Sequence, residues 1–199
     1  MEELLEKETQ KNKTQKKEAP RALKFFVIGG FICLAIALIF TSTYTSKPLT
    51  AAEIAQINAE KKSEFLKLES QVYTTTKQCD ADYSKAIKSI TNSGYGDSAT
   101  NFQNAHYDCL DAFNQVQKIQ IPDNLNDTQT KMLKAAIEDL TSAYACKNGA
   151  SQSAYKYITT GDISKMDKAK DEINLSQEGL LNAMFKIEQV KKELNISAK

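Results

Sequence analysis

The pattern of hydrophobic and polar positions divides the chain into one continuous apolar run and a long segment with apolar residues at helical spacing. The run extends from Phe25 to Phe40, and no charged residue occurs between Phe25 and Ser46. As a helix, residues 25–46 would measure about 33 Å, enough to cross a bilayer core of about 30 Å. We therefore predict a single transmembrane helix over residues 25–46.

The distribution of basic residues predicts the orientation of this helix. The first cation after the run is Lys47, whereas six basic residues precede it closely: Lys11, Lys13, Lys16, Lys17, Arg21 and Lys24. Because cytoplasmic flanks are enriched in Lys and Arg, residues 1–24 are predicted to be a cytoplasmic basic tail. The chain is thus expected at the cell membrane, single-pass, with residues 47–199 outside the cytoplasm.

A cleaved signal peptide is the main alternative to this signal-anchor, because Thr41–Thr43 and Thr45–Ser46 loosely fit a small-residue cleavage site. The 24-residue tail and the long apolar core favour an uncleaved anchor. Cys33 follows Ile32, where a lipidated cysteine would need a small residue, and we interpret it as an apolar residue of the span.

The tail is too short to contain a signalling output domain. It carries seven cations, five acids and only three large apolar residues, so it cannot bury a core. We therefore do not expect a receptor with its own cytoplasmic catalytic domain.

Apolar residues in the segment 47–199 recur every three or four positions, which is the period of an α-helix. Glycine, proline and capping residues separate four such stretches. The first expected helix runs from the capping-box pattern Thr50–Glu53 to a turn at Asn92–Asp97. The second follows this turn and ends before Pro122, the third runs from Asn126 or Asp127 to Gly161, and the fourth from Asp162 to about Leu194. The apolar face of the second helix contains Phe102, Ala105, Cys109, Phe113 and Val116.

We predict an all-α protein in which the transmembrane helix is followed by an up-down antiparallel four-helix bundle. The first helix of the bundle is about twice as long as the second, so its membrane-proximal half is expected to meet the third and fourth helices or to act as a stalk or dimer seam. Lys61 occupies an apolar position of that seam, which weakens the coiled-coil interpretation. Asn148–Gly149 is expected to bend or break the third helix.

Charge and composition exclude some functions of the bundle. Residues 47–199 hold 19 lysines and 20 acidic residues, so no nucleic acid partner is implied. A single histidine, His106, argues against hydrolase chemistry, and no cofactor motif is present. The protein is not expected to be an enzyme. The tyrosines are interpreted as the rims of a core without tryptophan, with a binding surface as the alternative.

The three cysteines outside the membrane suggest a structural crosslink. Cys79 lies about 18 Å before the end of the first helix and Cys109 about 18 Å after the start of the second. In an antiparallel pair of helices these two residues lie at the same level along the helix axis. A Cys79–Cys109 disulfide is therefore predicted, and Cys146 is predicted to stay unpaired. The alternative is three buried free thiols.

A metal or thiol-redox site at the same place is a second hypothesis. His106 and Cys109 are three residues apart on one predicted helix, and Cys79 and Asp82 are three apart on another. Facing helices could bring such pairs together as four ligands. Amphipathic helices produce this spacing by chance, so no metal is assigned.

The C-terminal half resembles a known group of domains. The resemblance covers about residues 119–195 and rests on Ile119-Gln-Ile-Pro-Asp-Asn-Leu125, Leu140, Ala143, the turn at Tyr157–Asp162 and the last helix. These features resemble uncharacterised membrane-anchored or lipoprotein helical domains of Gram-positive bacteria. The resemblance implies an extracytoplasmic helical domain and assigns no functional residue. The cysteines depart from it.

The sequence therefore predicts a membrane-anchored, extracytoplasmic helical domain that binds a partner, most simply a protein, at the bacterial cell envelope. A homo-oligomer is compatible with this prediction. The alternatives are a thiol-redox or metal-handling domain that uses Cys79, Cys109 and His106, and a sensor ectodomain that acts through a separate transducer.

Overall fold

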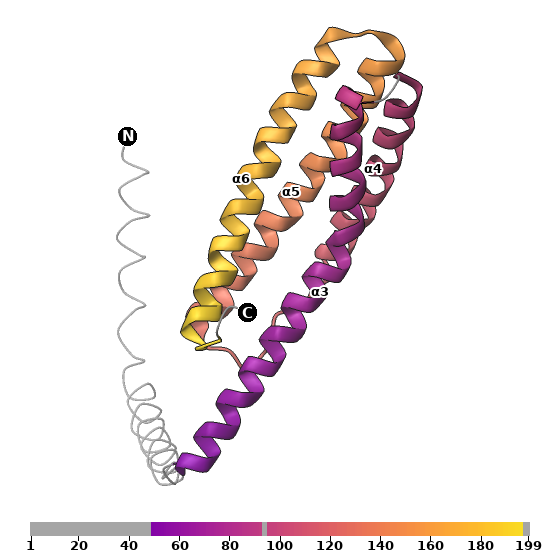
Figure 1. The fold of residues 1–199 in the computed structure, drawn as a ribbon. Helices are drawn as coiled ribbons and strands as arrows, with labels where there is room; N and C mark the ends of the chain where they lie inside the picture. Colours follow the sequence, from indigo (N-terminus) through magenta and orange to yellow (C-terminus); the bar gives the residue numbers. More distant parts are fainter. Residues whose placement is uncertain (1–48, 93–94, 197–199) are drawn as a thin grey trace, which may run out of the picture. The chain divides into compact units, whose positions relative to one another are not determined.

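The computed structural model describes residues 49–92 and 95–196, and all regular structure in them is α-helical. Four helices follow one another, each antiparallel to the last, in the predicted up-down bundle (Figure 1). They are α3 (Ala51–Asn92), α4 (Tyr95–Val116), α5 (Asp127–Thr160) and α6 (Ile163–Glu193). The predicted tail (1–24) and transmembrane helix (25–46) lie outside the described residues. Among the helices between residues 51 and 193, none is long and apolar enough to cross a membrane.

The start of α3 and both ends of α5 lie where the sequence signals predicted them, because side chains or glycine satisfy the backbone there, whereas α4 begins at Tyr95, within the turn predicted over Asn92–Asp97. At the start of α3, Thr50 Oγ1 accepts from the Glu53 amide (3.2 Å), and Glu53 Oε2 accepts from the Thr50 amide (2.7 Å). Asn126 caps α5 in the same reciprocal way with Gln129. Gly161 ends α5 with a φ of 74°, a conformation that favours glycine.

Gly149 does not break α5, contrary to the expectation from the sequence, and the helix is continuous from Asp127 to Thr160. α6 approaches closely at this position. A Cβ atom at position 149 would overlap the carboxylate of Glu172, so a larger residue there would have to displace that side chain.

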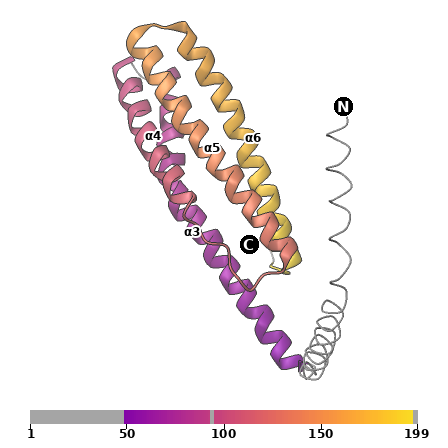
Figure 2. The ribbon, with the colours of Figure 1, turned by 180° about the vertical axis from the view of Figure 1, so that it is seen from behind.

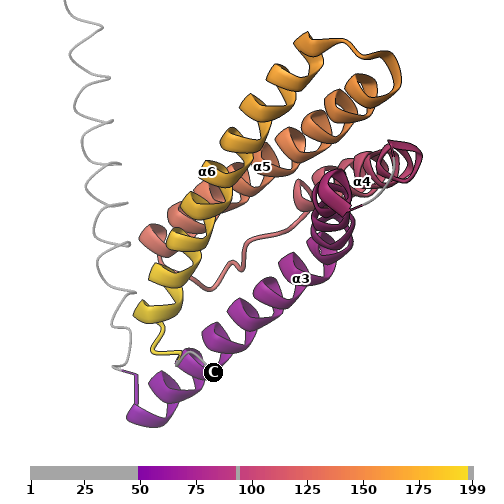
Figure 3. The same ribbon diagram turned by 45° about the horizontal axis from the view of Figure 1, so that its top comes forward.

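Neighbouring helices in the sequence are neighbours in the bundle: α3 packs on α4, α4 on α5 and α5 on α6 (Figures 2 and 3). The first and last helices meet mainly near the C-terminal end of α6. There, Lys191 Nζ lies 2.7 Å from Glu69 Oε1, and Lys62 Nζ donates to the Asn195 carbonyl oxygen at 3.2 Å. Further along, α3 and α6 diverge.

The apolar faces of the four helices form one main core and a smaller one. The main core contains Phe65, Val116, Leu133 and Val190, none of which has exposed surface. The smaller core surrounds Phe102 and consists mostly of alanines. Small side chains let the helix backbones approach closely at that end.

The length mismatch between α3 and the other helices leaves the start of α3 uncovered. Residues 51–60 are all exposed, and the first fully buried residue of α3 is Phe65. From Phe65 onward α3 contributes to the main core. The N-terminal part of α3 thus projects beyond the bundle, as Figure 1 shows, while the next turns meet α6.

Candidate functional site

A disulfide between Cys79 and Cys109 joins α3 to α4. This pairing was predicted from the positions of the two cysteines along antiparallel helices. Cys79 lies 13 residues before the end of α3, and Cys109 lies 14 residues after the start of α4. Both residues have no exposed surface and belong to the main core. The bond therefore fixes the axial position of α3 relative to α4 from inside the bundle.

Cys146 is a free thiol on α5 and is partly buried. Burial, followed by the negative charge of Glu172, raises the pKa of the thiol above its usual value. Because the thiolate is the reactive form, a raised pKa lowers the nucleophilicity of Cys146 at neutral pH. This weighs against Cys146 as the attacking thiol of a redox site.

His106 lies on α4 and faces α5, where its Nδ1 is 3.4 Å from the carbonyl oxygen of Asn148. The proposed metal ligands Cys79 and Cys109 are bonded to each other, so neither can act as a thiolate ligand without reduction. Asp82 is hydrogen bonded to Gln78. Within residues 49–92 and 95–196, no cluster of three or more His, Cys, Asp or Glu side chains is placed to hold a metal ion.

Two carboxyl groups meet between α3 and α4, one turn from the disulfide. Burial, a hydrogen bond with Asp82 and the negative charges of Asp82 and, to a smaller extent, Asp111 together raise the pKa of Asp108 from 3.8 to about 6. Above pH 6 the Asp108 carboxylate is ionised and is repelled by the negative charge of Asp82 across the helix pair.

We predict that Asp108→Asn stabilises the protein at pH 7.5 by about 1 kcal/mol, a value reduced for the partial exposure of the carboxyl group. Because the folded pKa of Asp108 exceeds the unfolded one, its contribution to stability is fully present below about pH 4 and is lost as the pH rises through about 6. The advantage of the variant over the wild type should therefore vanish at pH 4. Urea unfolding at both pH values measures this, with exposed Asp123→Asn as the control. An equal advantage at both pH values would contradict the assignment.

A buried lysine, Lys147 of α5, holds α3 and α5 together near the disulfide. The residue is only 7% exposed, and its Nζ forms an ion pair with Asp80 of α3. The same carboxylate accepts from the Tyr144 hydroxyl at 3.0 and 3.1 Å. The ammonium also lies 4.8 Å from the ring centroid of Tyr144 and 5.6 Å from that of Tyr83, which are cation–π distances.

The two tyrosines of this cluster differ in their hydroxyl groups. Burial raises the pKa of Tyr83 to about 12, with the charge of Glu172 as the next cause, and burial also raises the pKa of Tyr144. Both phenols stay protonated at neutral pH and can donate hydrogen bonds. Tyr144 donates to Asp80, whereas the buried Tyr83 hydroxyl has no partner among the described residues.

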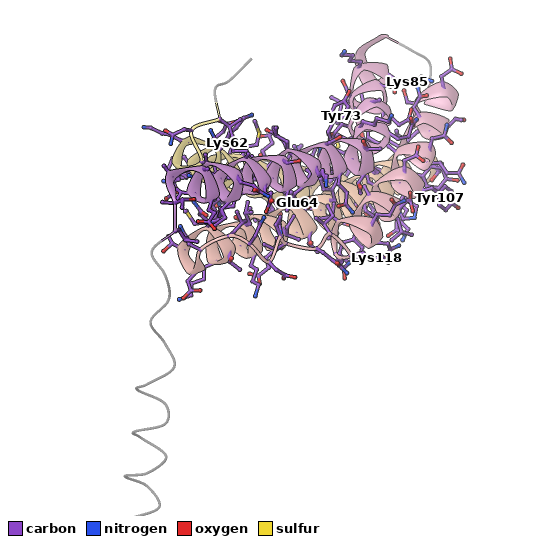
Figure 4. The ribbon with its side chains drawn as sticks, turned by 90° about the horizontal axis from the view of Figure 1, so that it is seen from below. Lys62, Glu64, Tyr73, Lys85, Tyr107 and Lys118 are labelled. Atoms are coloured by element: carbon purple, nitrogen blue, oxygen red, sulfur yellow. A yellow bond between two sulfur atoms is a disulfide. The ribbon has the colours of Figure 1, made fainter. Side chains whose placement is uncertain are left out.

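An apolar patch lies on the outward side of α6. Leu181, Met184 and Phe185 are 68%, 60% and 65% exposed, and their spacing places them within one face of the helix. Glu178 precedes the patch by one turn and Glu188 follows it by one turn. Other exposed aromatic residues stand singly, such as Tyr73 and Tyr107, which Figure 4 labels. Leu181, Met184 and Phe185 are called the α6 patch below.

No protein-family model, curated protein or solved structure matches this chain. The resemblance over residues 119–195 therefore stays a prediction. The fold and the arrangement of the described side chains are the observations from which function must be argued.

Sequence reasoning identified Cys79, Cys109, His106 and the tyrosines but missed Lys147 and Asp80. A signal for the lysine exists in the pattern, because position 147 continues the buried face of α5, which includes Leu140, Tyr144 and Ser151. A lysine on such a face needs a buried partner. The identity of that partner depends on how α3 and α5 are packed, which the sequence pattern does not contain.

Proposed function

We propose that this protein is a single-pass membrane protein whose extracytoplasmic helical bundle binds a protein partner at the bacterial cell envelope. The transmembrane helix over residues 25–46 would anchor it, with the basic tail in the cytoplasm. The proposal of a protein partner is carried by one observation, the α6 patch.

The composition of the α6 patch supports a protein interface. It combines phenylalanine, methionine and leucine, each at least 60% exposed, whereas single exposed apolar residues are ordinary on protein surfaces. Phenylalanine and methionine are enriched in the cores of interfaces, which are surrounded by polar rims. Glu178 and Glu188 would form an acidic rim, so the partner is expected to present an apolar surface bordered by basic residues.

The proposal can be tested in intact cells with a membrane-impermeant maleimide that carries a photoreactive group. The full chain would carry Phe185→Cys in a Cys146→Ser background. We expect labelling without lysis, because residue 185 is predicted to lie outside the membrane, and a discrete crosslinked adduct after illumination, because position 185 would lie in the interface.

Two matched controls separate the parts of the proposal. Leu175→Cys is exposed on the same helix but at a different angle from the α6 patch, so it should be labelled and give no adduct. Lys13→Cys, in the predicted cytoplasmic tail, should be labelled only after lysis. Labelling of Phe185→Cys only after lysis would refute the topology, and equal adducts from positions 175 and 185 would refute the role of the α6 patch.

A further inference from the structure

A pocket of about 270 Å³ lies at the end of the bundle where α3 and α5 end and α4 and α6 begin (Figure 1). All four helices contribute to its lining. The apolar lining consists of Ile90 of α3, Phe102 of α4, Ala154 and Ile158 of α5, and Met166 of α6. Ser98 and Tyr157 complete it. The space between these residues is called the Phe102 pocket below.

The Phe102 pocket reaches from the surface into the smaller core. Ile90 is 52% exposed, whereas Phe102 and Ala154 are only 1% and 8% exposed. Phe102 and Ala154 belong to the smaller core, whose other buried residues are all alanines. An alanine side chain ends at its Cβ atom, so this core leaves space that larger apolar side chains would fill. Because protein interiors contain few voids larger than a water molecule, an apolar space of this size is suited to hold a ligand.

The lining of the Phe102 pocket favours a neutral ligand over an ion. None of the described residues that line it is Asp, Glu, Lys, Arg or His. The hydroxyl of Ser98 donates to the carbonyl oxygen of Ser89 at 2.9 Å, within the protein. A charged ligand would therefore lose its hydration in this pocket without gaining an ion pair, which costs free energy.

We propose that the Phe102 pocket binds a small neutral aromatic molecule. An apolar cavity of about 150 Å³ is sufficient to bind benzene, so this pocket has room for one aromatic ring with a short substituent. The ligand ring would pack against the rings of Phe102 and Tyr157, since aromatic rings attract one another in offset or edge-to-face arrangements. The thioether of Met166 would add a sulfur–aromatic contact.

Methyl NMR of the full chain in lipid nanodiscs, with methyl-labelled methionine, tests the proposal at the pocket itself. Met166 lines the Phe102 pocket, whereas Met184 belongs to the exposed α6 patch and is the internal control. The probes are benzyl alcohol, its saturated counterpart cyclohexylmethanol, and the ions benzoate and benzylamine. We expect benzyl alcohol to shift the Met166 signal saturably and the Met184 signal little, with a Kd of about 1 mM or lower.

The other probes test the chemical class of the ligand. Cyclohexylmethanol should bind about threefold more weakly, because it cannot make the contacts between aromatic rings. Benzoate and benzylamine should bind about tenfold more weakly, because the pocket offers no opposite charge. Equal affinity of cyclohexylmethanol would overturn the aromatic class, and equal affinity of either ion would overturn the neutral class. No saturable shift of Met166 at about 10 mM benzyl alcohol, or equal shifts of Met166 and Met184, would overturn the proposal.

Substitutions that fill the Phe102 pocket locate the binding. Ala154→Leu places a larger apolar side chain in the space, so it should weaken benzyl alcohol binding by about tenfold and leave the Tm the same or higher. Ile158→Trp fills the same space from the next turn of α5, at a half-buried position that tolerates a larger side chain more easily. It should also weaken the binding, and it keeps the test available if Ala154→Leu does not fold.

Ala81→Leu, at an exposed position of α3, is the matched control for Ala154→Leu and should leave the affinity unchanged. An unchanged affinity in the filling variants, or an equal loss in Ala81→Leu, would overturn the assignment of the pocket. This inference does not rest on the α6 patch. Phe185→Ser should abolish partner crosslinking and leave benzyl alcohol binding intact, so that failure of either proposal can be recognised separately.

Discussion

Reduction of the Cys79–Cys109 disulfide is expected to lower the Tm of the bundle by about 10 °C. The bond closes a loop over a sequence separation of 30 residues, and the chain-entropy argument assigns about 3.6 kcal/mol to a loop of this length. In a domain of this size, each kcal/mol corresponds to about 2–4 °C in Tm. Thermal unfolding followed by circular dichroism, with and without reductant, measures the difference.

The free thiol provides the control for this experiment. Cys146→Ser should show the same loss of Tm on reduction as the wild-type protein, because Cys146 does not take part in the bond. Cys79→Ala/Cys109→Ala should have a low Tm in both conditions and no response to reductant. A full response to reductant in this double variant would show that the stabilising bond involves other cysteines.

Asp80→Ala is expected to destabilise the bundle by about 2 kcal/mol, whereas Lys147→Met should cost clearly less. Removal of Asp80 leaves the buried Lys147 ammonium without its carboxylate and takes the acceptor from the Tyr144 hydroxyl. The value is set below the usual cost for a buried pair because the Asp80 side chain is 45% exposed. Lys147→Met instead replaces the cation with an apolar side chain of similar length, and the remaining carboxylate can be hydrated.

The double variant Asp80→Ala/Lys147→Met tests this asymmetry directly. Its free energy of unfolding should exceed that of Asp80→Ala alone, because the second substitution removes the unpaired charge. Lys165→Met, at an exposed ion pair with Asp162, is the control and should change stability little. If the effects of Asp80→Ala and Lys147→Met simply add, the two side chains do not form a coupled pair.

Much of the fold follows from local features of the chain. The capping pair Thr50–Glu53, the Asn126 cap and the C-terminal Gly161 predicted helix ends because the bonds that they make join residues three or four positions apart. The Cys79–Cys109 bond was also predictable, since short connections force successive helices to be antiparallel and a constant rise per residue then sets the height of each cysteine.

Gly149 shows the limit of local reasoning. A glycine within a helical pattern is a reasonable place to expect a break, yet α5 continues through it, and Glu172 of α6 lies against that position. The same limit applies to Asp108 and Asp82, whose carboxyl groups come from two helices and share one environment. Neither contact has a counterpart in the spacing of residues along one helix.

The sequence by itself predicted the all-α bundle, most of its helix ends and the preferred cysteine pair, because these depend on the period of apolar residues, on capping interactions over short separations and on the helical rise. The tertiary structure decided that Lys147 is paired with Asp80 beside two tyrosine rings, that the Tyr83 hydroxyl is buried, and that α3 and α6 leave a groove between them. These features depend on the rotation and spacing of helices about one another. Many side chains acting together set that packing, and no short segment of the sequence encodes it.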